Sequence, residues 1–211
     1  MKKSNIFLFI AICLAICLPI PGRFGYGIIV ALSMNFYMLL ICLVGKLIDK
    51  IKLTSLRPVC ILFTLVCSAV FFRQLVIIFS PIIALSLGLL LYFPILGVLM
   101  ICDCLEKDEF SLKKSLSTNM IMSGKISIFI LIFFLVRDIA GYGTITIPIP
   151  SGLFKIYLPQ ILNFSPSVFF ATISGGLVLA GIFLALMTLV HRKCNIISRS
   201  SELQEELTNA D

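Results

Sequence analysis

Long apolar runs separated by short polar segments make up most of this chain. A helix that crosses a bilayer needs about 20 mostly apolar residues. Six runs approach or reach that length: 5–20, 26–45, 58–79, 82–102, 120–137 and 167–190. The pattern predicts an all-α integral membrane protein with six transmembrane helices. We expect a single transmembrane domain over residues 1–193 and a polar cytoplasmic tail over residues 194–211.

Prolines interrupt two of the six runs. Pro19 and Pro21 end the first run early, and Pro94 lies in the middle of the fourth. Proline removes a helix hydrogen bond, and in transporters such breaks expose backbone groups that line a site. A simple kink is the commoner result of one proline. Breaks in helices 1 and 4 would relate the two halves of the chain as a 3+3 inverted repeat, although no repeat of residues accompanies it.

A long connection, 138–166, follows the fifth run and is rich in glycine and proline. Within it, Leu153–Leu162 is a candidate for lying flat at the membrane interface. In the sixth run, small residues recur four positions apart, a spacing that lets another helix approach closely. The small-residue spacing predicts packing rather than chemistry.

Composition indicates that lipid is the solvent. The chain is 60% hydrophobic and 13% charged, whereas a soluble domain carries about 25% charged residues. The net charge of +7 does not indicate nucleic-acid binding, because the basic residues flank the apolar runs. The positive-inside rule places both termini in the cytoplasm. The basic residues on that side are Lys2, Lys3, Lys46, Lys50, Lys52, Arg57, Lys107, Lys113, Lys114, Arg192, Lys193 and Arg199.

Two charged residues fall inside apolar runs. Lys125 stands near the start of the fifth run, and Arg73 stands late in the third. A charge within the membrane is a candidate for function by default. For both residues we favour the simpler interpretation, in which the long side chain reaches the nearby interface.

No soluble-enzyme chemistry can be located in the sequence. Most of the eight cysteines lie within apolar runs, where cysteine packs as a small hydrophobe. The only histidine is His191, and Cys194 has no nearby partner, so we expect no metal site. Walker A, G-x-G-x-x-G and H-E-x-x-H sequences are also absent.

Three segments together resemble the small membrane subunits shared by the Rnf and Nqr electron-transport complexes, above all the RnfE/NqrD type. Tyr92–Leu96 is similar to the family's aromatic-x-Pro-Leu-Ile stretch, and 136–144 is similar to its R-E-I-x-G-x-G-T. Phe170–Ala185 resembles its glycine-rich last span. The motif residues in the first two segments are Pro94, Arg137, Asp138, Gly141 and Gly143.

The resemblance implies a fold and a setting. The fold would be an inverted repeat of three helices with broken first and fourth spans. The chain would lie in the bacterial inner membrane beside other membrane subunits of a hetero-oligomeric complex, including a homologous subunit of opposite orientation. A [2Fe–2S] cluster would be shared between two such subunits, each giving two cysteines.

This chain departs from the family at the cluster positions. The family has a cysteine before proline at the end of span one and another six residues after the span-four proline. Here Leu18 separates Cys17 from Pro19, and Met100 occupies the second position. Cys102 lies two residues further along, about 200° around a helix. We therefore expect no cofactor in this chain alone, and Cys17 and Cys102 are the candidate positions if a cluster is shared.

The leading interpretation is a non-catalytic membrane subunit of an Rnf/Nqr-like complex that couples electron transfer to Na⁺ or H⁺ translocation, without a complete Fe–S ligand set of its own. The flavins would sit on partners, because no flavin attachment motif is present. The alternative is a six-helix component of a small-solute, vitamin-type transporter, with an outward polar pocket that 138–166 could cap. A helper protein with neither role is a third interpretation.

Overall fold

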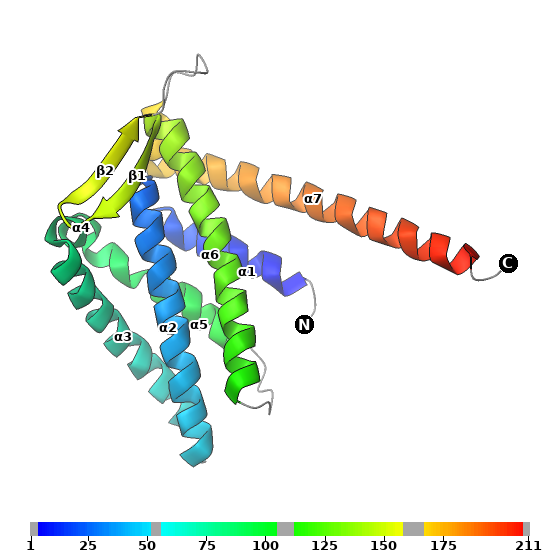
Figure 1. Ribbon diagram of the computed structural model, residues 1–211, viewed down its shortest axis with the longest axis horizontal. Coiled ribbons are helices and arrows are strands. Elements are labelled where there is room, and N and C mark those ends of the chain that lie inside the picture. Colours follow the sequence, from blue (N-terminus) through cyan, green and yellow to red (C-terminus); the bar gives the residue numbers. More distant parts are fainter. Residues whose placement is uncertain (1–3, 52–55, 105–111, 158–166, 209–211) are drawn as a thin grey trace.

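The computed structural model describes residues 4–51, 56–104, 112–157 and 167–208, and most of them are helical (Figure 1). Two strands and two short 3-10 helices, labelled η, interrupt the helices. In chain order the elements are α1 (Ser4–Cys17), α2 (Phe24–Ile51), α3 (Arg57–Phe79), α4 (Pro81–Leu87), η2 (Gly88–Tyr92), α5 (Pro94–Cys104), α6 (Leu112–Tyr142), β1 (Thr144–Ile149), β2 (Gly152–Tyr157), η3 (Val168–Ala171) and α7 (Ile173–Thr208).

Five helical stretches in the described part of the chain are long and apolar enough to cross a membrane. These stretches fit a multi-pass membrane protein, the class that the composition also indicates. The stretches are Phe24–Ile48, Arg57–Phe79, Pro81–Met100, Asn119–Tyr142 and Ile173–Val190.

The predicted first span is shorter than the sequence pattern indicated. α1 has 14 residues, or about 21 Å of helix, against a hydrocarbon core of about 30 Å. Pro19 and Pro21 explain its end, because neither has an N–H to continue the helix. The chain turns here, and the Ile20 N–H donates to the Cys17 carbonyl at 3.2 Å. A count of six crossing helices therefore stays a prediction.

The predicted fourth span is interrupted, and the interruption begins before the proline. Gly88 ends α4 with a φ of 50° and opens η2. Pro94 is the first residue of α5, a position where the missing N–H sacrifices no helix hydrogen bond. Gly88, rather than Pro94, therefore starts the break.

Two strands depart from the all-α expectation. β1 and β2 form an antiparallel hairpin in which Thr144 lies opposite Tyr157 and Ile149 lies opposite Gly152. The Thr-Ile alternation of β1 favours an extended strand, because β-branched side chains fit a pleated surface. The predicted interfacial segment Leu153–Leu162 is thus a strand as far as Tyr157, and the rest of it lies outside the described residues.

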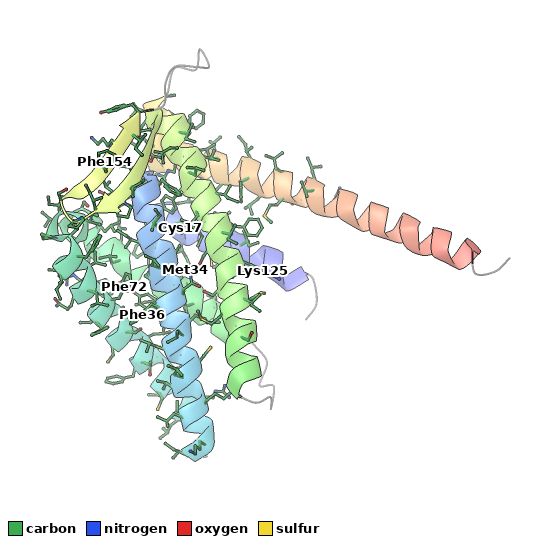
Figure 2. The ribbon with its side chains drawn as sticks, viewed as in Figure 1. Cys17, Met34, Phe36, Phe72, Lys125 and Phe154 are labelled. Carbon is green, nitrogen blue, oxygen red and sulfur yellow. The ribbon has the colours of Figure 1, made fainter. Side chains whose placement is uncertain are left out.

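α2 is the central helix and packs against α6, α3, α5 and β1. Between α2 and α3, the ring of Phe36 lies 6.1 Å from that of Phe71 and 5.7 Å from that of Phe72 (Figure 2). α1 packs on α5 and α6. α7 runs unbroken to Thr208, contacts mainly η3 and projects away from the bundle (Figure 1).

The hairpin, the start of α2, the end of α6 and the start of α7 gather at one end of the bundle, which we call the hairpin end (Figure 1). The end of α2, the start of α3 and the start of α6 lie at the opposite end. Lys50 and Arg57 are therefore far from the hairpin. This separation follows the predicted charge asymmetry, while the side of the membrane that each end faces stays a prediction.

Candidate functional site

Arg137 lies near the end of α6 and is completely buried. Its guanidinium donates to five backbone carbonyls that belong to two distant segments. Nη1 donates to Leu18 (3.2 Å) and Ile20 (2.8 Å) in the turn after α1. Nε and Nη2 donate to Phe170 (3.3 Å), Ala171 (3.1 Å) and Thr172 (3.0 Å) around η3. One side chain thereby joins the turn after α1 to the segment around η3 that precedes α7.

These carbonyls are available because the local sequence breaks the helices. The last carbonyls of a helix lack partners within it, and the prolines after Cys17 supply no N–H. η3 is only four residues long, too short to satisfy its own carbonyls. A guanidinium carries five N–H donors in a planar fork. Arg137 uses this fork to pair the free carbonyls of both segments at once.

Two glycines make room for the guanidinium. A Cβ on Gly22 would lie 2.7 Å from Arg137 Nε, and a Cβ on Gly176 would lie 3.0 Å from Arg137 Cζ. Gly22 belongs to the turn after α1, and Gly176 belongs to the first turn of α7. Each segment thus supplies both carbonyls and the space beside them.

Asp138 is also completely buried and binds a different set of groups. Its Oδ2 accepts from the backbone N–H of Phe24 (3.1 Å) and from the N–H (2.9 Å) and hydroxyl (2.8 Å) of Thr146. Its Oδ1 accepts from the Thr144 hydroxyl at 3.1 Å. Asp138 therefore ties β1 to the start of α2.

The start of α2 gains a cap from this arrangement. Its first residue, Phe24, donates to Asp138, and the next N–H, that of Gly25, donates to Thr146 Oγ1 at 3.0 Å. A carboxylate at a helix N-terminus is favourable, because it meets free N–H groups and the positive end of the helix dipole. Arg137 and Asp138, about 100° apart on α6, thus serve different segments and do not bind each other.

Gly141 and Gly143 have separate roles at the end of α6. A Cβ on Gly141 would lie 2.9 Å from the Cβ of Ala171, so this glycine permits the close approach of η3. Gly143 has a φ of 63° and donates its N–H to the Ile139 carbonyl at 2.9 Å, as a left-handed residue after a helix does. The structure therefore gathers four of the five motif residues at one junction.

Pro94 lies apart from this junction, at the start of α5. α5 packs against α1, and the contact is close at Gly97, where a Cβ would lie 3.3 Å from Cys13 Sγ and 3.4 Å from Met34 Cε. α1 and α5, which belong to the two broken spans, thus touch, and side chains of α1 and α2 lie at the contact.

Of the two candidate cluster positions, the structure describes the side chain of Cys17 only, whereas a [2Fe–2S] cluster is held by cysteine thiolates. Cys17 on α1 is only 2% exposed, whereas Met100 on α5 is 47% exposed and carries a thioether. Cys102 lies in the last turn of α5, and its side chain falls outside the described residues. Among the residues whose side chains are described, no group of three cysteines, histidines or carboxylates could hold a metal ion.

The two charged residues that interrupt apolar runs of the sequence lie on the outside of the bundle. Lys125 is exposed on α6, and Figure 2 shows it away from the junction. Arg73 is exposed on α3, and its Nη1 donates to the Tyr92 hydroxyl at 3.4 Å. This bond connects α3 to the break in the fourth span.

Sequence reasoning missed the threonines of β1 and a polar network inside the bundle. Asn35 on α2 donates to Ser127 at 2.8 Å and accepts from Ser123 at 2.9 Å. The signal for this network is the spacing of Ser123 and Ser127, which places both on one face of α6. For Thr144 and Thr146, the signal is their alternation with isoleucine.

The arrangement is that of a structural junction. The five donors of Arg137 and both oxygens of Asp138 are occupied by groups of the same chain. A general acid or base must reach a substrate proton directly or through water, and here both charges are committed and buried. Comparison with known protein families and with curated proteins gives no match to this chain.

Proposed function

We propose that the chain is a non-catalytic membrane subunit of an Rnf/Nqr-like electron-transport complex, in which it helps electron flow couple to Na⁺ or H⁺ movement. The observation that carries the proposal is the position of residues 136–144, the most specific of the three segments that resemble the family. Residues 136–144 form the junction at which the end of α1, the start of α2, β1 and η3 meet. A motif with this role would stabilise the arrangement of the helices in a scaffold subunit.

The arrangement of the broken spans also favours this proposal. The resembled fold is an inverted repeat in which the first and fourth spans are broken. Here α1 ends early, the fourth span is interrupted at η2, and α1 packs on α5. Apolar side chains along α3 and α7 are widely exposed, which leaves room for neighbouring subunits as well as lipid.

The test is to purify the full chain under mild detergent from its native membrane and to identify its companions by mass spectrometry. We expect flavoprotein and iron–sulfur subunits in fixed proportion to the chain. Companion ATPase subunits would instead support the vitamin-type transporter. Recovery of the chain without any companion would also contradict the proposal.

A matched pair of variants links assembly to the junction. Arg137→Lys retains a cation but cannot reach both sets of carbonyls, and we expect it to reduce co-purification of the companions. Arg73→Lys, at an exposed arginine with a single long bond, is the control and should leave co-purification unchanged.

A further inference from the structure

The β1–β2 hairpin directs the threonines of β1 inward. Directly paired residues of a two-stranded sheet lie on the same face, and faces alternate along each strand. Thr144, Thr146 and Pro148 therefore share one face. Thr144 and Thr146 are buried against Asp138. The β1 part of this face therefore belongs to the junction, whereas Lys155 and Tyr157, their partners on β2, are exposed.

The opposite face of the hairpin carries only apolar residues and is exposed in its middle. The pairs Ile145–Ile156, Ile147–Phe154 and Ile149–Gly152 form it. Ile147 is 40% exposed, Phe154 is 53% exposed and Ile156 is 43% exposed. A hairpin on a soluble protein would bury this face and direct the threonines to water.

The place of the hairpin indicates what covers the apolar face. Its turn lies beside α4, because a Cβ on Gly152 would be 3.7 Å from Ile82 Cγ2. Ile82 and Leu85 of α4 belong to a membrane-crossing stretch and are exposed. The apolar face thus adjoins an exposed apolar surface of a stretch that is long enough to cross a membrane.

The charges and aromatic residues near the hairpin also match a membrane interface. Residues 144–157 contain Lys155 and no carboxylate. Tyr157 is exposed at the end of β2, and Arg23 lies 4.2 Å from the ring of Tyr142 at the same end of the bundle. Tyrosine concentrates at membrane interfaces, and long basic side chains reach lipid phosphates from there.

We propose that the hairpin is a membrane-interface element, with Ile147, Phe154 and Ile156 in contact with the lipid of the leaflet at the hairpin end. The hairpin is an inside-out sheet, with threonines toward the protein and isoleucines toward lipid. This assignment is independent of the electron-transport proposal, because it rests only on the hairpin and its neighbours.

The chain contains no tryptophan, so single tryptophans report on chosen positions without background. We would place them by Phe154→Trp and by Lys155→Trp, its neighbour on the opposite face of β2, with Leu85→Trp as a lipid reference. The full-length variants are reconstituted into phosphatidylcholine vesicles with or without brominated lipid, and iodide is the aqueous quencher.

We expect brominated lipid to quench position 154 more strongly than position 155, and iodide to quench them in the reverse order. Any other ranking of the two positions would overturn the proposal. A photoreactive benzoylphenylalanine at position 154, irradiated in intact cells, should give no crosslinked polypeptide. A crosslink to another protein would show that a partner covers this face, and would also overturn the assignment.

Discussion

Arg137 is a buried charge that backbone dipoles balance. Burying an ion costs several kcal/mol unless it is fully bonded. A hydrogen bond to a charged group contributes about 1.5–3 kcal/mol, so five of them amount to about 7–15 kcal/mol and can offset that cost. The carbonyls benefit equally, because an unpaired backbone oxygen inside a membrane is expensive. The side chain therefore stabilises the turn after α1 and the segment around η3, and their carbonyls stabilise the buried charge.

Replacing Arg137 should show this mutual dependence. Arg137→Ala leaves five carbonyls without their donor, at about 1–3 kcal/mol for each one that water cannot reach. We expect a loss of at least about 5 kcal/mol and poor accumulation in the membrane. Millimolar guanidinium should partly restore thermal stability in detergent, because it can enter the vacated space. Arg73→Ala is the control, and equal stability of the two variants would contradict the role assigned to Arg137.

Two variants of Asp138 separate the contribution of its hydrogen bonds to stability from the contribution of its charge. In Asp138→Asn, the amide oxygen can accept from Phe24 and Thr146 while the amide nitrogen donates to the Thr144 hydroxyl. Asp138→Ala leaves the buried N–H groups unpaired. We expect Asp138→Ala to cost about 3 kcal/mol or more and Asp138→Asn distinctly less. Thermal unfolding in detergent measures both, and equal losses would mean that the charge itself matters most.

Part of this residue-level picture could be predicted from the sequence. Adjacent helical residues point about 100° apart, so a direct Arg137–Asp138 pair was not expected. The actual partners could not be predicted, because Leu18 and Ile20 precede Arg137 by 119 and 117 positions. Backbone carbonyls carry no sequence signature, so only the folded chain identifies them.

At the scale of elements, the approach of α7 to α6 depends on where its glycines stand. Gly176→Ala would place a methyl group 3.0 Å from Arg137 Cζ, whereas Gly181→Ala in the same helix meets nothing within 4 Å. We expect Gly176→Ala to lower the unfolding temperature. Gly181→Ala should be neutral or stabilising by up to about 1 kcal/mol, since alanine favours helix. A lower unfolding temperature for Gly181→Ala than for Gly176→Ala would show that α7 does not pack closely on the guanidinium.

The helices themselves were largely predictable, and the departures have local causes. Apolar runs of sufficient length identified every crossing stretch in the described residues. The hairpin was missed because its isoleucines look equally suited to a flat interfacial segment. The break in the fourth span was assigned to Pro94, while Gly88 with its positive φ begins it. A glycine in an apolar run is common, so sequence alone did not single it out.

Contact between α1 and α5 would be the place for an iron–sulfur cluster in the resembled family. We expect none held by this chain, because Met100 stands where a thiolate is required. Electron paramagnetic resonance of the reduced complex tests this, with Cys17→Ser and Cys102→Ser as variants. A cluster signal in the wild type that disappears in both variants would contradict the prediction.

For the molecule as a whole, the charge asymmetry predicts its orientation. The hairpin turn lies at one end and Lys50 and Arg57 at the other, and basic segments stay cytoplasmic. Reporter fusions at Ser111 and Ser201 should be active in the cytoplasm, and a fusion at Ser151 in the hairpin turn should be active outside. A cytoplasmic Ser151 fusion would reverse the topology.

The bonds of Arg137 also impose an order on biogenesis. During synthesis, the Leu18 carbonyl emerges 119 residues before its donor. At about 5–20 residues per second, this delay is roughly 6–24 s. The insertion machinery must shelter the turn after α1 throughout that time, and η3 completes the junction only later. The turn after α1, which is made early in synthesis, is thus among the last parts of the protein to mature.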